Sequence, residues 1–154
     1  MVDAASLGET DGTLRDAAGY LHDVLFILQK RISSSGRSAM KTTNAVPVLI
    51  AANKQDLFTA LPSGSVRDKL ETEIDRIRKS RSRGLMDASE GPNTGAEDDE
   101  ILGGDEAQGS FTFKLLEEEF GIHVDVVGGA VKADGEADIL AGVRKWEEWI
   151  GMCL

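Results

Sequence analysis

The sequence is short of the residues that build disulfides and metal sites. It contains one cysteine, Cys153, and two histidines, His22 and His123, in 154 residues. A single cysteine excludes an internal disulfide and a zinc site built from cysteine pairs. The histidines lie far apart in the sequence and no cysteine cluster accompanies them, so we expect no metal site. One lone thiol is typical of a reducing compartment such as the cytosol.

Basic residues and long apolar runs are scarce as well. The chain has 17 Lys and Arg against 27 Asp and Glu, a formal net charge of −10. Because an acidic chain is repelled by a phosphate backbone, we expect no nucleic acid as a direct partner. No apolar run approaches the roughly 20 residues that a membrane-spanning helix needs. Residues 1–6 lack the basic and apolar regions of a signal peptide.

Short apolar segments predict the strands of one domain. Residues 1–3, 46–52 and 123–127 have the composition of buried strands, and the first of these looks like the end of a strand. Residues 111–113 alternate in polarity and are predicted to form a further short strand. The segment that follows, 114–120, fits either a helical turn or a loop.

Apolar residues recur at spacings of three and four between these strands, which is the helical period. The pattern predicts a helix over about residues 13–32, a second from about residue 65 and a third from about residue 138. The apolar faces consist of Leu14, Ala18, Leu21, Leu25, Leu28 and Ile32, then Val66, Leu70, Ile74 and Ile77, then Ile139, Val143, Trp146 and Ile150. Trp146 and Trp149 fit packing rather than a cofactor platform. The alternation of strands and helices predicts an α/β fold with a parallel sheet.

An acidic segment interrupts this alternation. Residues Asp87 to Glu106 include eight acidic residues and no basic ones. They offer too little apolar surface to offset the entropy of ordering, so we expect a mobile acidic insertion at about residues 84–109. The helix before it ends in a cluster of basic residues, namely Arg76, Arg78, Lys79, Arg81 and Arg83. We interpret that cluster as a solvated helix end that complements the helix dipole.

The apolar segment Val46–Ala52 is followed directly by Asn53-Lys54-Gln55-Asp56. In an open α/β sheet, ligands bind just beyond the carboxyl ends of the strands. The pattern N-K-x-D at this place is the guanine-recognition motif of GTP-binding proteins. An ordinary polar turn after a strand is the alternative interpretation.

The residue types fit guanine chemically. Guanine presents N1–H and a 2-amino group side by side, and the carboxylate of Asp56 can accept both hydrogen bonds at once. Adenine would leave that carboxylate unpaired, so it would be rejected. The Lys54 stem can lie flat on the base while its ammonium stays in water. The Asn53 amide can hold neighbouring loops and face the base edge, and Gln55 needs no role.

The end of the later strand supplies a second part of this candidate site. Strand residues 123–127 lead into Gly128-Gly129-Ala130. Small residues there would allow a backbone N–H, that of Ala130, to approach the guanine carbonyl oxygen. The predicted site therefore comprises Asn53, Lys54, Asp56, Gly129 and Ala130, with no catalytic residue and no metal ligand.

Several segments together resemble the beta subunit of the signal recognition particle receptor, a family of small GTPases of the endoplasmic reticulum membrane. Residues 53–57 alone would also suit the ADP-ribosylation-factor family. Three other segments are more specific to the receptor family. They are the helix Leu-Glu-Thr-Glu-Ile with the Arg/Ser-rich segment after it, the later Phe-Thr-Phe, and the final Lys-Trp-Glu-Glu-Trp-Ile. These occupy residues 70–74, 76–82, 111–113 and 145–150, and the resemblance extends back to residues 1–3.

The resemblance implies a partial P-loop GTPase-like three-layer fold, in which helices flank a parallel sheet. The N-terminal strands, the phosphate-binding loop, the magnesium ligands and the membrane-spanning helix of the family have no counterpart in the sequence. Residues 1–154 would be the C-terminal half of a small GTPase domain. Three strands would leave an open sheet edge where the missing N-terminal half pairs. The second guanine loop also departs from the family's Ser-Ala-Lys, with Gly129-Ala130-Val131 in its place.

The resemblance also implies the biology. The complete protein would bind GTP, with Mg²⁺ held by the missing half. It would recruit the receptor alpha subunit to the cytosolic face of the endoplasmic reticulum membrane for co-translational protein targeting. Membrane contact would come only through the absent N-terminal helix. This chain alone would lack a cradle for the β- and γ-phosphates, which phosphoryl transfer requires.

Two alternatives remain at this point. One is a non-catalytic interaction module whose open sheet edge is completed by a partner chain. The other is a truncated relative of the ADP-ribosylation factors, against which the basic helix ending and the acidic insertion argue.

Overall fold

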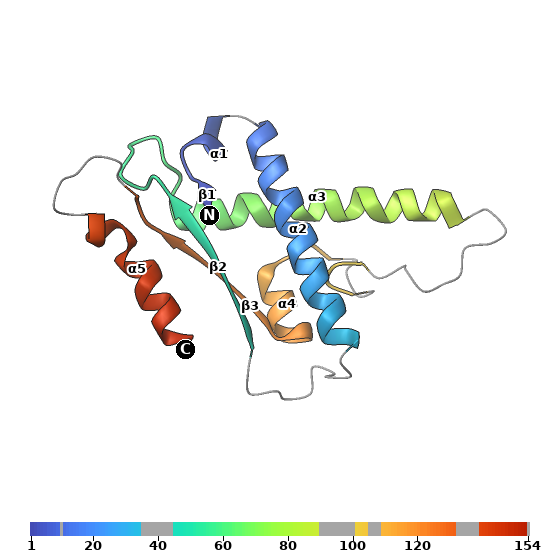
Figure 1. Cartoon of the computed structure of the whole chain (residues 1–154). Helices are drawn as coiled ribbons and strands as arrows, with labels where there is room; N and C mark the ends of the chain where they lie inside the picture. The colour runs from blue at the N-terminus through green and yellow to red at the C-terminus, as the bar shows by residue number, and fades with distance from the viewer. Residues whose placement is uncertain (10, 35–44, 90–100, 105–108, 132–138, 154) are drawn as a thin grey trace.

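A computed structural model describes residues 1–9, 11–34, 45–89, 101–104, 109–131 and 139–153 of the chain (Figure 1). The strands are β1 (Val2–Asp3), β2 (Val46–Asn53) and β3 (Ile122–Gly128). The helices are α1 (Ser6–Glu9), α2 (Asp11–Ser34), α3 (Ser63–Ser89), α4 (Phe113–Phe120) and α5 (Ile139–Met152). No helix of this described part is long and apolar enough to cross a bilayer.

The predicted parallel sheet is confirmed. Its order is β1-β2-β3, and both pairings are parallel. The register sets Asp3 beside Asn53, and Ala52 beside Gly128. All three strands therefore end at one edge of the sheet, where the sequence predicts the site. β1 pairs only with the last two residues of β2.

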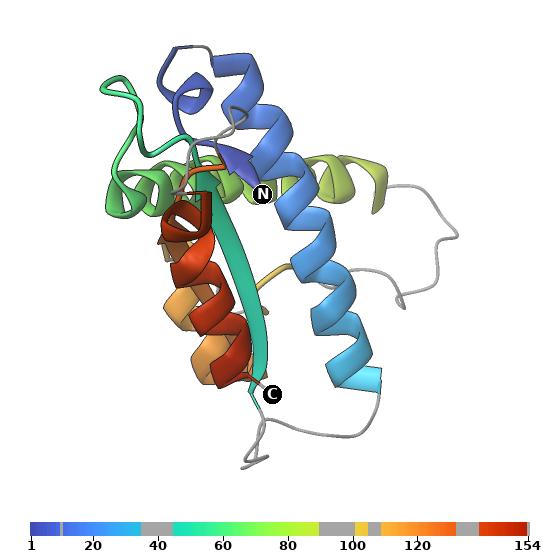
Figure 2. The ribbon, with the colours of Figure 1, turned by 60° about the vertical axis from the view of Figure 1, so that its left-hand side comes forward.

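The two faces of the sheet have different coverings. Ile50, Val124 and Val126 belong to the core that α2 and α3 complete. The alternate residues of β3 face the other way, because successive strand side chains point to opposite faces. On that face the indole of Trp149 donates to Asp125 (2.7 Å), which attaches α5 to the sheet (Figure 2). The result is the three-layer arrangement of an α/β fold.

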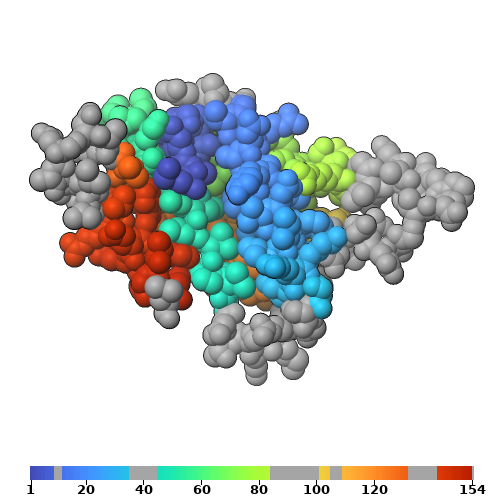
Figure 3. Space-filling model, in the orientation of Figure 1, coloured from blue at the N-terminus to red at the C-terminus, as the bar shows by residue number. Residues whose placement is uncertain are grey.

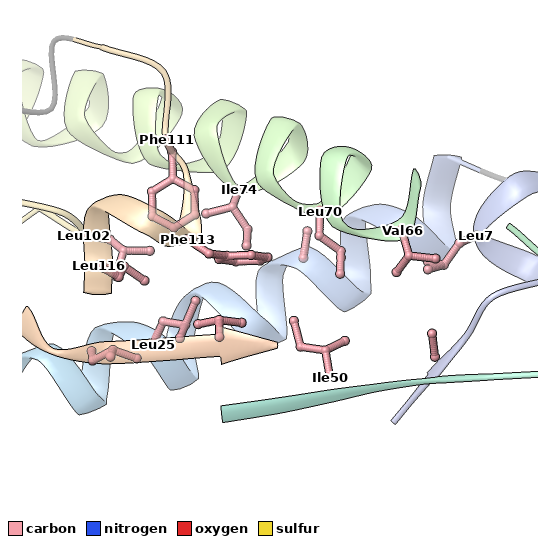
Figure 4. Packing of buried hydrophobic residues seen from close by; sticks show 14 of the residues in the cluster. Leu7, Leu25, Ile50, Val66, Leu70, Ile74, Leu102, Phe111, Phe113 and Leu116 are labelled. Carbon is pink, nitrogen blue, oxygen red and sulfur yellow. The ribbon is translucent and has the colours of Figure 1, made fainter. Parts of the chain in front are cut away.

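The core lies between α3, α2 and the sheet (Figure 4). Leu25 of α2 and Leu70 and Ile74 of α3 are fully buried, as their helical spacing predicts. Trp146 of α5 is also buried and donates from its indole to the Val127 carbonyl at 2.8 Å. The expectation that the tryptophans serve packing is confirmed.

Residues 111–113 form no strand, contrary to the prediction. Phe111 and Phe113 are buried and meet edge to face, with ring centroids 5.9 Å apart. Their backbone N–H groups donate to α3 carboxylates, Phe111 to Asp75 (3.1 Å) and Phe113 to Glu71 (2.9 Å). Thr112 caps the following helix, α4, by accepting from the Leu115 N–H. The hydrogen-bonding groups that a strand would need are used by a helix distant in sequence.

Parts of the predicted insertion at about residues 84–109 belong to the folded body. Helix α3 continues to Ser89, and Leu102 is buried in the core. The buried side chain of Gln29 in α2 fixes this turn by donating to the Ile101 carbonyl (2.9 Å) and accepting from the Gly103 N–H (2.8 Å). Residues 90–100 and 105–108, which carry most of the acidic charge, lie outside the described residues.

His123 links two elements at the end of the sheet opposite the predicted site. Its Nδ1 lies 2.8 Å from Glu117 of α4, and its Nε2 lies 3.0 Å from Asp125 of β3. The Glu117 hydrogen bond chiefly, helped by the Asp125 charge, outweighs partial burial and raises the pKa of His123 above its ordinary 6.5. Because the pKa of His123 is higher in the folded state than in the unfolded state, protonation of His123 stabilises the fold. This stabilisation is complete at a pH below the unfolded-state pKa, and it is lost as the pH rises through the folded-state pKa.

We therefore predict that His123→Gln lowers the free energy of unfolding more at about pH 5.5 than at about pH 8.5. Urea unfolding of both proteins at the two pH values measures the difference. Burial, and then the Arg81 charge, lower the pKa of His22. Because His22 is present in both proteins, its contribution to the pH dependence of stability cancels in the comparison. An equal loss at both pH values would contradict the role of the charged imidazole.

Candidate functional site

The carboxyl edge of the sheet brings the predicted site residues together. Asn53 ends β2 and Asp3 ends the neighbouring β1, while β3 ends at Gly128. The turn after β2 lies against the N-terminal segment (Figure 3), where the Ala4 N–H donates to the Asn53 carbonyl at 3.1 Å. Residues from the beginning, middle and end of the chain thus meet at one place.

Asn53 connects the two loops of the predicted site. Its side-chain oxygen accepts the Val131 N–H at 2.9 Å. The two residues are 78 positions apart in sequence, so this bond fixes the loop after β3 against the end of β2. The expectation that the Asn53 amide holds a neighbouring loop is confirmed.

Lys54 has an unusual backbone and a fixed side chain. Its φ is +65°, the only positive φ of a non-glycine residue in the described part of the chain. Its Nζ lies 2.6 Å from Asp3 Oδ2, and both side chains remain partly exposed. The other carboxylate oxygen of Asp3 accepts the Ala5 N–H at 3.1 Å. The hydrogen bond from Lys54 in particular holds the pKa of Asp3 below its ordinary value, so Asp3 keeps its charge and directs Lys54 along the sheet edge.

Gln55 has a structural role that the sequence did not reveal. Its Nε2 donates to the Leu61 carbonyl at 2.6 Å, and its backbone N–H donates to the Gly129 carbonyl at 3.1 Å. Its side chain also covers Gly128, where an added Cβ would lie 3.1 Å from Gln55 Cγ. Gln55 therefore joins the start of α3 and both loops of the site.

Asp56 points away from these contacts and is exposed to solvent. Leu57 and Phe58 follow it on the same turn and are also exposed. The turn is closed by the Leu57 N–H, which donates to the Lys54 carbonyl at 3.0 Å. An exposed carboxylate on a closed turn is available to a ligand without first giving up a protein partner.

The second predicted loop is tightly packed. Gly129 and Ala130 are both buried. The Gly129 N–H donates to the Ala52 carbonyl at 2.9 Å, and the Ala130 N–H donates to the Gly142 carbonyl of α5 at 3.0 Å. The Ala130 N–H that the sequence analysis assigns to a guanine oxygen is thus used within the chain in this conformation.

Gly142 is a further residue on which this arrangement depends. A Cβ on Gly129 would lie 2.5 Å from the Gly142 carbonyl oxygen and 2.6 Å from Trp146 Cζ2. A Cβ on Gly142 would in turn overlap the Ala130 carbonyl oxygen. Only glycine at both positions allows α5 to approach the loop this closely. A glycine inside an otherwise helical pattern was the signal in the sequence that could have indicated this contact.

The residues of the candidate site include no phosphate-binding motif. The sequence contains no G-x-x-x-x-G-K-[ST] segment that could cradle phosphates. Gly104 to Gly109 with Ser110 is the nearest approximation, and it lacks the lysine and contains Asp105 and Glu106. In the described part of the chain, no group of three or more His, Cys, Asp or Glu could hold a metal ion.

Comparison with known proteins gives consistent matches. The family model described as signal recognition particle receptor beta subunit matches residues 1–120. The signal recognition particle receptor subunit beta of Saccharomyces cerevisiae is 26% identical over 137 residues, which cover 89% of this chain and 48% of the yeast protein. The chain thus spans about half of that relative.

Solved structures agree. The receptor protein SRb of Chaetomium thermophilum with GDP and Mg is 40% identical, with a TM-score of 0.72, covering 99% of this chain and 61% of that one. The complex of SRb with GTP and SRX from the same organism contains a chain that is 39% identical, with a TM-score of 0.74, covering 100% of this chain and 48% of that one.

We predict that Gly142→Ala lowers the free energy of unfolding by about 1–3 kcal/mol, because the methyl group must displace the Ala130 carbonyl. Gly151→Ala is the matched control in the same helix, where the added methyl meets open space. It should leave stability unchanged or raise it by up to about 1 kcal/mol. Urea unfolding measures both, and similar effects of the two variants would contradict the close approach.

Proposed function

The chain belongs to the signal recognition particle receptor beta subunit family, and we propose that it is the guanine-recognising half of a small GTP-binding protein. The observation that carries this proposal is the joining of Asn53 to Val131, which assembles both predicted guanine loops at the carboxyl edge of the sheet. This bond brings together two loops that are 78 residues apart in sequence, as a base-binding site made from both loops requires.

In this proposal, Asp56 accepts hydrogen bonds from guanine N1–H and the 2-amino group. The Lys54 stem covers one face of the base while Asp3 holds its ammonium. Gly129 and Ala130 contribute by their small size, because they let the loop after β3 come close to the base. Use of the Ala130 N–H by guanine would require its bond to Gly142 to open.

The nucleotide is GTP, and Mg²⁺ is held by residues of the N-terminal half that this chain does not contain. Structures of the family include SRb with GDP and Mg, and SRb with GTP in complex with SRX. The complete protein recruits the receptor alpha subunit to the cytosolic face of the endoplasmic reticulum membrane for co-translational protein targeting. We further propose that the complete protein reaches the membrane through an N-terminal helix.

A non-catalytic interaction module is the second candidate. It is favoured by one observation, the use of the N–H groups of Gly129 and Ala130 within the chain. The family match decides against the ADP-ribosylation-factor alternative. Nucleotide binding separates the two candidates that remain.

The chain on its own is predicted to bind GTP weakly or not at all, because base contacts alone leave the phosphates without a cradle. Calorimetric titration with GTP measures this. Fusion of the chain to the N-terminal half of the Chaetomium thermophilum relative should restore tight binding. A submicromolar Kd for the unfused chain would contradict the prediction, and a fusion that folds without binding GTP would favour the interaction module.

In the same fusion protein, Asp56→Asn is predicted to shift the base preference from guanine to xanthine by about a hundredfold, because the amide now complements the xanthine 2-oxygen. Competition of GTP with XTP measures the ratio. Asp68→Asn is a control at an exposed position of α3 and should leave the ratio unchanged. An unaltered ratio in the Asp56 variant would exclude Asp56 as the base reader.

A further inference from the structure

Helices α2 and α3 cross each other (Figure 1). Residues of both helices line a groove between them. Two adjoining hollows of about 380 and 350 Å³ form it, and they share the residues Arg15, Ile77 and Ser80. These volumes are of the size that protein ligand sites occupy. None of these shared residues belongs to the guanine site, and Ile77 packs against the edge of the core.

Arginines from both helices converge on the groove. Arg15 comes from α2, and Arg76 and Arg81 come from α3, where Arg81 already pairs with Asp23 of α2 at 2.6 Å. The side chain of Arg76 is 81% exposed and its ion pair with Glu73 is long, at 3.4 Å. Within the described part of the chain, Arg15 has no ion pair. The guanidinium groups of Arg15 and Arg76 can therefore bind a ligand's carboxylates without breaking strong bonds.

The charge here is opposite to that of the whole chain. Residues 76–83 contain five basic residues and no acidic one, although the net charge is −10. Of these five, Arg78 is buried, and Arg76 and Arg81 line the groove. Arginine forks pair with carboxylates in two parallel hydrogen bonds, which favours carboxylates as ligands.

The shape and lining of the groove favour a peptide. Cations that bind a flat lipid surface project from the protein, whereas Arg15 and Arg81 line a hollow together with Ile77 and Gly19. A nucleic acid presents a continuous row of phosphates, some of which would meet Asp16 and Glu73 in the lining, whereas a peptide can space its carboxylates to avoid them. A peptide can place acidic side chains on the arginines and an apolar one on the floor.

We propose that the α2–α3 groove binds an acidic peptide segment of a partner protein. This site is separate from guanine recognition and does not depend on it. Gly19 provides a direct way to test occupancy, because a Cβ there meets no atom within 4 Å and so points into open space. A larger side chain at this position would fill the groove without removing charge.

The test uses the full chain and a short fluorescein-labelled peptide in which Glu and Asp alternate with Leu, with a Gln/Asn version as the reference. Fluorescence anisotropy should detect the acidic peptide, and its affinity should fall as salt rises from about 0.05 to about 0.5 M. Arg15→Gln combined with Arg76→Gln should weaken binding by about tenfold or more. Gly19→Leu should do the same, while circular dichroism shows both variants folded.

Arg144→Gln is the matched control, since this arginine is 75% exposed and belongs to α5 on the opposite face of the sheet. It should change the affinity less than twofold. Equal binding of both peptides, or equal losses in the control and groove variants, would overturn the proposal. Binding to phosphatidylserine vesicles that needs Arg15 and Arg76, without peptide binding, would overturn it in favour of a membrane surface. A variant in which the four acidic residues 97–100 are replaced by Gln and Asn is a further test. If only this variant bound the peptide, the proposal would be overturned in favour of binding by the chain's own acidic segment.

Discussion

The parallel register between β2 and β3 is the constraint on which the candidate site depends. It sets Ala52 beside Gly128, so the two strands end together. Two loops distant in sequence then begin at the same edge, and β1 adds Asp3 there by pairing with Asn53. A slip of one residue would turn Asn53 to the opposite face and separate it from Val131. The recognition chemistry is thus a consequence of strand pairing.

Side chains convert this proximity into a fixed geometry. Asn53 bonds the second loop, Gln55 bonds both loops, and Asp3 holds Lys54. Gly129 permits α5 to close over the loop, where Trp146 packs against it. Asp56 is exposed and forms no ion pair within the described part of the chain. Such an arrangement is preorganised, because ligand binding would order few further groups.

The sequence predicted those features that depend on local pattern. The apolar period identified α2, α3 and α5, and the segment before Asn53 identified the central strand. Phe111 and Phe113 were misassigned because their N–H groups bond to Asp75 and Glu71, and no local pattern reports such distant acceptors. The same reason hid the role of Gln29, whose partners at 101 and 103 lie more than 70 positions away.

In the candidate site, too, local features could be predicted from the sequence and distant contacts could not. Its residue types and its place after a strand were predictable, since motif and strand are adjacent in sequence. The partners of Gln55 and Gly142 were not, because they arise where loops and helices pack. Asp3 was likewise absent from the predicted site. Its contribution depends on the pairing of β1 with the end of β2, which brings its carboxylate to Lys54.

The distribution of charge on α3 explains how an acidic chain can present a basic groove. Burial raises the pKa of Asp75, but bonds from Lys79 and the Phe111 N–H outweigh it, and the pKa lies below its ordinary value. Its single charge is shared among these donors and Arg78. Glu71 is similarly engaged by the Phe113 N–H. Asp75 and Glu71 of α3 bind the backbone at the start of α4. They therefore cannot fully neutralise the cations on the outer side of α3. The contacts that build the core thereby leave Arg76 exposed beside Arg15, while Arg81 pairs with Asp23 of α2.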